Sequence, residues 1–120
     1  MLDGSQAQRF AEEWYAAWNA RDLELILSHY AAEVVFTSPF VSALLGREDG
    51  TVRGLQELRN YFAPALERYP DLRFEPLSLL VGVDSVVLHY RSVGGRIAAE
   101  TMQLDEQGRV IRVLAHYDGA

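Results

Sequence analysis

Two spacings of apolar residues divide the chain. Up to about residue 70, apolar side chains recur every three or four positions, which is typical of amphipathic helices. This spacing predicts one helix from Ser5 to about Ala20, with Ser5 and Gln8 as a capping box. It predicts a second helix after Asp22 that reaches Tyr30, and a third helix over about 54–69. A short strand at 34–36 separates the second helix from the third.

From residue 72 onwards, the apolar spacing changes to two, which is the period of strands. We expect strands near 72–81, 86–93, 96–104 and 109–117. Gly94-Gly95 predicts a two-residue hairpin, and 105–108 predicts another turn. Helices followed by an antiparallel meander indicate an α+β fold, with the helices packed on one face of the sheet.

The segment 40–53 fits neither spacing. Its glycines and the charged run Arg47-Glu48-Asp49 favour a mobile loop, yet its start is apolar, with Phe40, Val41, Leu44 and Leu45. A lid over a cavity would account for the apolar start, and so would packing on the protein surface.

Composition narrows the class of protein. The 120 residues suit a single domain over 1–120, and no cysteine is available for disulfides or thiolate chemistry. The net charge is −6, and the eleven cations, all arginine, are scattered along the chain, so we expect no nucleic-acid partner. No apolar run approaches the roughly twenty residues of a membrane span. The N-terminus lacks the pattern of a signal peptide, so we expect a soluble cytoplasmic protein.

Glu100 is the residue with the clearest chemical potential. In the predicted strand it shares a face with Ala98, Met102 and Leu104, so a carboxylate lies among apolar neighbours. Glutamate is rarely buried without a partner. It is therefore either paired for structural reasons, with His89 or Arg91 as cross-strand partners, or placed there for acid/base chemistry.

Counting along the predicted hairpins gives Glu100 its expected neighbours. If Gly94-Gly95 is the whole loop, His89 lies directly opposite Glu100 on the same face, with Arg91 nearby. Pairing Leu104 with Arg109 in the next hairpin adds four mostly apolar residues to that face: Ile111, Val113, Ala115 and Tyr117. The same pairing sends His116 and Asp118 to the opposite face.

Several short segments resemble the SnoaL-like branch of the nuclear-transport-factor-2-like superfamily. They are Trp18–Asp22, Tyr30–Phe36 followed by Pro39, Arg53–Leu55 and Ala115–Asp118. The resemblance implies a cone-shaped barrel in which three N-terminal helices pack on a curved, mainly antiparallel sheet around a hydrophobic pocket. It also implies a homodimer. Members include isomerases, dehydratases, cyclases and non-catalytic binding proteins, so the resemblance indicates fold more than function.

The resemblance to ketosteroid isomerases can be carried over one residue at a time. Their general base, an Asp before the Pro that follows the first strand, corresponds to Ser38 here, so that base is missing. Their helix-one Tyr corresponds to Trp14, while Tyr15 is one position away and should point elsewhere. Their protonated Asp in the penultimate strand corresponds to Glu100. Similarity to SnoaL-like polyketide cyclases offers Glu100, His89, His116 and Asp118 as counterparts of the cyclase acid.

We therefore expect a protein that binds a small, apolar, cyclic carbonyl compound. It would be either a cofactor-independent acid/base enzyme of isomerase, cyclase or dehydratase type, or a non-catalytic dimeric domain for ligand binding or association. Glu100 would be the acid/base and His89 its partner. The three scattered histidines form no metal motif. The expected substrate-binding residues are Trp14, Trp18, Tyr30, Ser38, Phe62, Met102, Val113, Ala115 and Tyr117.

Overall fold

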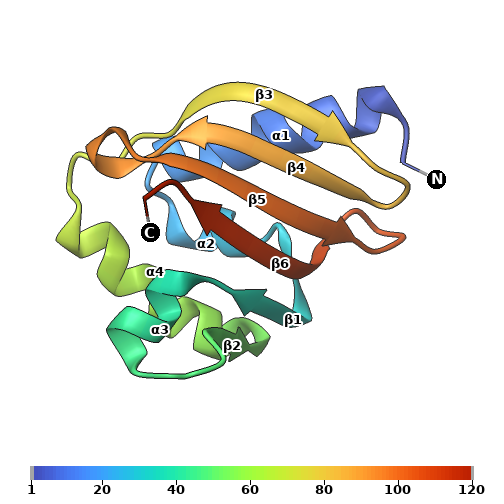
Figure 1. The fold of residues 1–120 in the computed structure, drawn as a ribbon. Helices are drawn as coiled ribbons and strands as arrows, with labels where there is room; N and C mark the ends of the chain where they lie inside the picture. Colours follow the sequence, from blue (N-terminus) through green and yellow to red (C-terminus); the bar gives the residue numbers. More distant parts are fainter. Residues whose placement is uncertain (1, 120) are drawn as a thin grey trace.

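The computed structural model describes residues 2–119 and contains helices on one side of a six-stranded sheet (Figure 1). The helices are α1 (Gly4–Asn19), α2 (Leu23–Leu27), α3 (Pro39–Leu45) and α4 (Gly54–Arg68). The strands are β1 (Tyr30–Thr37), β2 (Thr51–Arg53), β3 (Glu75–Val81), β4 (Ser85–Arg91), β5 (Ile97–Leu104) and β6 (Val110–Tyr117).

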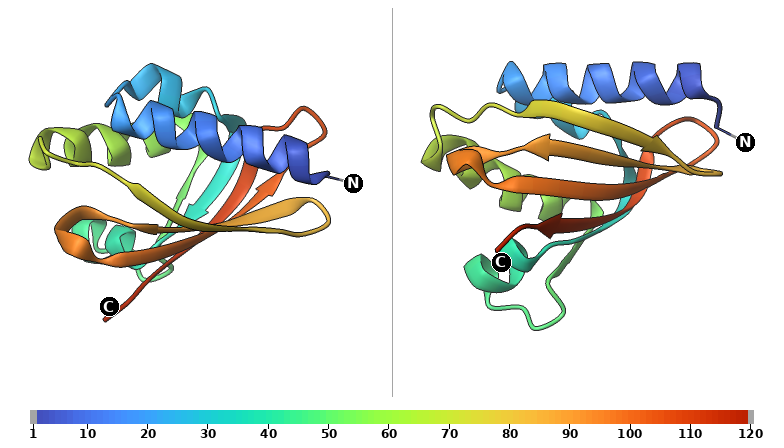
Figure 2. Two further views of the ribbon diagram at one scale, coloured as in Figure 1. Left: turned by 90° about the horizontal axis from the view of Figure 1, so that it is seen from above. Right: turned by 45° about the horizontal axis from the view of Figure 1, so that its top comes forward.

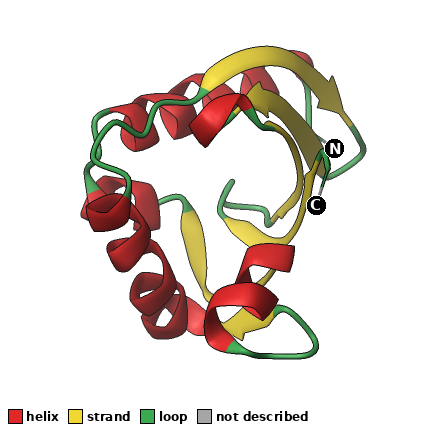
Figure 3. Cartoon of the chain, turned by 60° about the vertical axis from the view of Figure 1, so that its left-hand side comes forward, coloured by secondary structure: helices red, strands yellow, loops and turns green. Residues whose placement is uncertain are grey.

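The strands lie in the order β2-β1-β6-β5-β4-β3. Every neighbouring pair is antiparallel except β1 and β6, which are parallel. Figure 3 shows the sheet curving round one side of a cone, with helices along the other side. This arrangement confirms the predicted α+β fold, although the sheet stays open and does not close into a barrel.

Helix α1 buries the face that its apolar spacing predicts, including Phe10, Trp14 and Trp18. Its N-terminus differs from the prediction. Asp3, not Ser5, is the capping residue: its side chain accepts from the backbone N–H of Gln6, and the Gln6 side chain accepts from the N–H of Asp3. The sequence offers two overlapping capping patterns, and the aspartate cap lies two residues before the serine.

The segment after Thr37 is more regular than predicted. Ser38 caps α3 through a 3.2 Å hydrogen bond from the Phe40 N–H, and Pro39 takes the first helical position, where it needs no N–H. Gly46 ends the helix with φ of 67°, a conformation that favours glycine. The predicted mobile loop at 40–53 therefore contains a helix and a short strand, β2, which pairs with β1. The predicted second helix also ends early, because Tyr30 already belongs to β1 and pairs with Val110.

The β4–β5 connection corrects the predicted register. The loop has five residues, 92–96, instead of two, and it closes with Arg91 paired to Ile97. Gly94 and Gly95 do adopt the positive φ angles expected of them, 70° and 76°. The different loop length shifts the pairing by one residue, so Leu88 lies opposite Glu100 and His89 lies opposite Ala99. A one-residue shift moves every side chain of a strand to the other face.

The β5–β6 pairing places Val113, Ala115 and Tyr117 on the face of Glu100, as predicted. Leu104 pairs with Val110 rather than with Arg109, and an irregularity between Gln103 and Leu104 absorbs the difference. It also displaces Ile111 from the predicted face, since the buried residue at this end is Val110.

An aromatic cluster fills the space between α1, α4 and the sheet. Most of its rings pack edge-to-face or tilted, with centroids 4.8 Å apart for Trp18 and Phe62 and 4.6 Å apart for Phe74 and Tyr90, while Trp14 and Phe74 are stacked. The cluster holds the Tyr90 ring in place, and the hydroxyl of this ring donates a hydrogen bond to Glu100.

None of the described helices has the length and apolar character needed to cross a membrane.

Candidate functional site

Glu100 is buried on the concave face of β5, with 4% of its surface exposed. Its partner is Tyr90 on the neighbouring strand, whose hydroxyl donates a short hydrogen bond to Oε2. In the part of the chain that the structure describes, this is the single hydrogen bond made by the Glu100 side chain, so Oε1 is the oxygen left for another partner.

Burial changes the acidity of this pair. It raises the pKa of Glu100 from 4.5 to about 7, because the apolar surroundings disfavour the carboxylate, and the bond from Tyr90 only partly opposes this rise. Burial, together with the nearby Glu100 charge, raises the pKa of Tyr90 well above 10. Near neutral pH, Glu100 therefore has both protonation states available, while Tyr90 stays a hydrogen-bond donor.

Glu100 lines a pocket of about 300 Å³ whose walls are mostly aromatic. The walls come from α1, α3, α4, the β4–β5 loop and the strands β1, β4, β5 and β6. These elements meet at the end of the molecule where α4 ends and the β4–β5 loop turns, on the left in Figure 1 and again in both views of Figure 2. The aromatic residues of the pocket are Trp18, Phe36, Phe40, Tyr61, Phe62, Tyr69, Phe74, Tyr90 and Tyr117.

Four of the residues proposed from the sequence line this pocket: Trp18, Phe62, Glu100 and Tyr117. Others lie in the core behind it. The Trp14 indole N–H donates to the Tyr30 hydroxyl at 3.0 Å, and both side chains are almost fully buried. Met102, Val113 and Ala115 are buried on the sheet face that carries Glu100, but they are not among the lining residues in the described part of the chain.

His89 does not pair with Glu100. Because of the five-residue loop, its side chain lies on the opposite face of the sheet, where Nδ1 is 2.9 Å from the Ser78 hydroxyl. Arg91 moves to the outer face for the same reason. The predicted Glu-His constellation is therefore wrong, and Tyr90 takes the place expected of His89.

His116 and Asp118 lie outside the pocket, as the predicted β5–β6 register places them. His116 is exposed, and its Nδ1 lies 3.3 Å from the Ala99 carbonyl oxygen. The Asp118 carboxylate accepts a 2.8 Å hydrogen bond from the Ile97 N–H. Neither residue contributes to the lining of the Glu100 pocket.

Ser38, which the sequence resemblance aligns with the base of ketosteroid isomerases, is buried and caps α3. Glu100 is the one carboxylate among the described residues that line the pocket. Any proton transfer between protein carboxylates and a ligand in this pocket would therefore depend on Glu100 alone.

Several residues at the pocket or next to it were not predicted from the sequence. Tyr90 was missed because the hairpin count put it on the wrong face, and Tyr61 because it flanks the predicted buried stripe of α4. Tyr15 was expected to point away, yet its ring lies 5.8 Å from that of Tyr90, and burial together with the nearby Glu100 charge raises its pKa. The apolar start of 40–53 was the available signal for Phe40, Ala43 and Leu44, which lie at the pocket.

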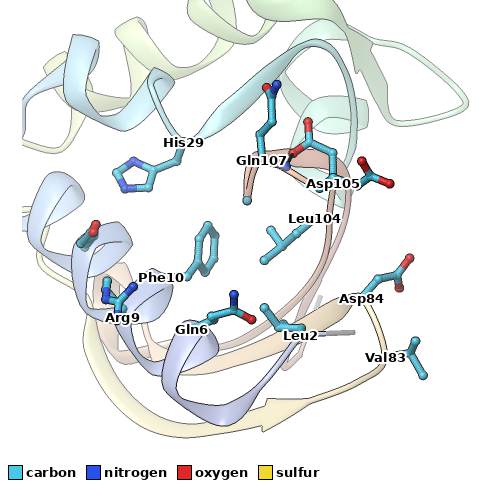
Figure 4. Close-up of a pocket in the computed structure, with 13 residues that line it drawn as sticks. Leu2, Gln6, Arg9, Phe10, His29, Val83, Asp84, Leu104, Asp105 and Gln107 are labelled. Atoms are coloured by element: carbon cyan, nitrogen blue, oxygen red, sulfur yellow. Dashed lines mark hydrogen bonds between the residues drawn. The ribbon is translucent and has the colours of Figure 1, made fainter.

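A second, wider hollow lies at the opposite end of the molecule, on the right in Figure 1, and Figure 4 shows its lining residues. It measures about 860 Å³ and is lined by the start of α1, by His29 and by the β3–β4 and β5–β6 turns. Its carboxylates, Glu13, Asp84, Asp105 and Glu106, are exposed or half-buried. Its size alone does not make it a site, since it lacks the buried carboxylate and the aromatic walls of the Glu100 pocket.

Together, the open-sided cone and the aromatic pocket with one buried carboxyl define a class of α+β domains in which helices and a curved sheet enclose a pocket. A sequence profile of the SnoaL-like domain matches residues 11–119. The chain therefore belongs to the SnoaL-like family.

One solved structure supports this assignment, and two more distant ones share the fold. A SnoaL-like protein of unknown function from Burkholderia thailandensis is 44% identical, with 98% of each chain covered and a TM-score of 0.95. A proposed ketosteroid isomerase from Kribbella flavida is 18% identical over 97% of this chain and 80% of its own, with a TM-score of 0.74. A proposed polyketide cyclase from Sinorhizobium meliloti is 12% identical over 96% of this chain and all of its own, with a TM-score of 0.75. No curated protein matches the chain.

Proposed function

We propose that this protein binds a small, largely apolar, cyclic carbonyl compound in the Glu100 pocket and catalyses a cofactor-independent proton transfer on it. The observation that carries the proposal is a buried carboxyl with a pKa of about 7 at an aromatic pocket. Groups with strongly shifted pKa values cluster at functional sites, and a base or acid works best when its pKa lies near the working pH.

The chemistry follows from the two protonation states of Glu100. The ionised carboxylate can take a proton from a carbon next to the ligand's carbonyl, and the electron pair then moves into an enolate. The same carboxyl, now protonated, returns the proton to another carbon or to oxygen. Tyr90 fixes Oε2 throughout, so Oε1 is the oxygen that exchanges the proton. Isomerisations, dehydrations and aldol-type ring closures all include such a step.

The test is Glu100→Gln, which keeps the shape of the side chain and removes its acid/base function. Turnover of a confirmed substrate should fall roughly 10²–10⁴-fold, while its Kd changes only a few-fold. The matched control is Glu106→Gln, an exposed glutamate of the wide hollow, which should leave turnover unchanged. Unchanged turnover in Glu100→Gln would exclude the acid/base role.

A second candidate function is ligand binding without catalysis. Ser38 in place of the isomerase base and the single carboxylate at the pocket favour it. Under this alternative, the Glu100→Gln variant binds ligand normally, and no candidate substrate is turned over by either protein. The non-catalytic alternative also includes a pure association domain, in which the cavity would be collapsed. The pocket of about 300 Å³ disfavours that version.

We also propose that the protein forms a homodimer through the outer face of its sheet. Leu80, Val87, Thr101 and Leu114 oppose one another in turn across β3, β4, β5 and β6, and Leu80 is 59% exposed. The other three residues are half-buried, and solvent-accessible, mainly apolar surfaces of this kind are found at interfaces. Light scattering after gel filtration should give a dimer mass, which Leu80→Glu should shift towards the monomer.

Leu44→Glu is the control for the dimer proposal. Leu44 is equally exposed, at 58%, but lies at the pocket on the other side of the molecule. This variant should keep the dimer mass, and a monomeric unmodified protein would contradict the proposal. A cytoplasmic location stays a prediction from the sequence.

A further inference from the structure

The charges at the pocket differ between its depth and its mouth. Three charged side chains line it: Glu100, Arg68 and Arg96. Glu100 is buried, whereas Arg68 is exposed at the end of α4 and Arg96 is half-buried in the β4–β5 loop. These two segments lie at the same end of the molecule in Figures 1 and 2. The pocket therefore has a carboxyl at its inner end and two guanidinium groups at its outer end.

The two guanidinium groups rest on aromatic rings at the mouth. The Arg96 Cζ lies 5.5 Å from the centroid of the Phe40 ring, and the Arg68 Cζ lies 5.8 Å from that of Tyr69. Arg96 also donates a 3.1 Å hydrogen bond to the Asp118 backbone oxygen. These contacts hold the cations at the rim, where a stacked guanidinium keeps N–H donors free for a ligand.

Among the residues that the structure describes, neither of these cations forms an ion pair with a carboxylate. The three ion pairs within residues 2–119 use Arg47, Arg53 and Arg59, all of which lie away from the pocket lining. The chain as a whole carries a net charge of −6. The mouth of the Glu100 pocket therefore carries two arginines without an ion pair in a chain that is acidic overall.

We propose that the pocket selects a planar ring compound that carries a carboxylate or a similarly anionic oxygen at its solvent-facing end, with Arg96 and Arg68 as the residues that recognise this anion. This inference rests on the proposed ligand-binding function and narrows its ligand class. The aromatic walls favour a flat ring system. Guanidinium groups form charge-assisted, often bidentate hydrogen bonds with carboxylates.

The opposite charges also fix the orientation of the ligand. An anionic group at the inner end would be repelled by Glu100 whenever that carboxyl is ionised, whereas at the outer end it meets Arg96. A neutral carbonyl or hydroxyl group at the inner end can accept a hydrogen bond from protonated Glu100 or donate one to its ionised form. The arginines would therefore set which end of the ligand reaches the proton-transfer group.

The test compares two probes of nearly the same shape, 2-naphthoate and neutral 2-naphthamide, by isothermal titration calorimetry at low salt. At a pH of about 6, the probe's carboxyl group is ionised because ordinary carboxyl pKa values lie near 4. We expect 2-naphthoate to bind roughly tenfold more tightly than the amide, since hydrogen bonds to charged groups are the stronger ones. Raising the salt concentration should reduce this preference.

Variants of the two arginines test whether the preference for 2-naphthoate comes from the mouth of the pocket. Arg96→Gln should bring the two affinities close to parity, and Arg68→Gln should reduce the preference by a smaller factor because Arg68 is more exposed. Arg109→Gln, which removes the same charge from the distant β5–β6 turn, should leave the preference unchanged. Thermal unfolding of each variant checks that the fold is intact.

The outcomes separate the two proposals. If both probes bind the unmodified protein equally well, the pocket binds ligands but the anion inference is wrong. If the preference survives in the Arg68→Gln/Arg96→Gln double variant, the assignment to these arginines is wrong. If neither probe binds, the proposed ligand-binding function fails and this inference fails with it.

Discussion

The two hollows at opposite ends of the cone differ in what surrounds their carboxylates. The wide hollow of about 860 Å³ has four acidic residues on its walls, all at least partly in contact with water. The narrow pocket of about 300 Å³ has one, and it is buried among aromatic rings. Water stabilises an exposed carboxylate in its charged form, whereas burial brings its pKa towards neutrality. The comparison shows that the environment of one carboxyl group, and not the volume of the cavity, identifies the better candidate site.

Filling each hollow should separate them most clearly. Ala65 lines the narrow pocket on α4, and Ala65→Trp should abolish binding of 2-naphthoate, a loss of more than about 4 kcal/mol or a thousandfold in Kd. Gln6→Trp, which fills the wide hollow, should leave that Kd unchanged. Calorimetric titration measures both. Lost binding in Gln6→Trp alone would move the site to the wide hollow.

The pH dependence of stability should come from the narrow pocket. The pKa of Glu100 is raised in the folded state from 4.5 to about 7, so the folded protein binds more protons than the unfolded chain between these values. Its contribution is therefore fully present below a pH of about 4.5 and is lost as the pH rises through about 7, a change of about 3 kcal/mol.

Urea unfolding across this pH range checks the linkage. Glu100→Gln should lack this loss, so its stability relative to the unmodified protein rises towards alkaline pH. Glu106→Gln, in the wide hollow, should follow the unmodified protein. Parallel curves for Glu100→Gln and the unmodified protein would contradict the raised pKa.

Tyr90→Phe tests the same buried pair, with a smaller expected effect. It keeps the packing of the ring against Phe74 and removes the donor that stabilises the Glu100 carboxylate. The pKa of Glu100 should rise by roughly one further unit, as followed by NMR of carboxyl-labelled glutamate. The control is Tyr15→Phe, since the Tyr15 hydroxyl is buried without a partner in the described structure and its loss should leave that pKa almost unchanged.

The smallest effect belongs to His89. On the outer face it contacts Ser78, so His89→Gln should cost no more than about 0.5 kcal/mol of stability and leave ligand affinity unchanged. Chemical denaturation and the naphthoate titration measure the two quantities. A large loss of affinity would restore the Glu-His pairing that the observed register excludes.

Much of the fold could be predicted because the spacing of apolar residues along the chain indicates which side chains are buried. The stripe of α1 and the alternation around Glu100 follow from which residues face the core, and the structure confirms both. The partner of Glu100 could not be predicted so simply. Gly94-Gly95 indicates a turn with positive φ but not its length, and a five-residue loop exchanges His89 for Tyr90.

The helix α3 shows a different limit. Its signals were present, with Ser38 as the cap, Pro39 at the first position and Gly46 at the end, but the two glycines and the charges nearby favoured a loop. Seven residues are too few for spacing to outweigh such signals. This short helix places Phe40, Ala43 and Leu44 at the pocket wall. From the sequence, the segment was predicted only to be a loop with an apolar start.

The position of the last strand has a consequence for how the protein is made. β6 is inserted between β1 and β5, in the middle of the sheet, so the two parts of the sheet that precede it along the chain are not paired with each other. During synthesis, these parts can join through β6 only after that strand has left the ribosome. Tyr117, at the end of that strand, is also a wall of the pocket. Completion of the sheet and completion of the pocket are therefore the same event, and a nascent chain stalled before β6 would have neither.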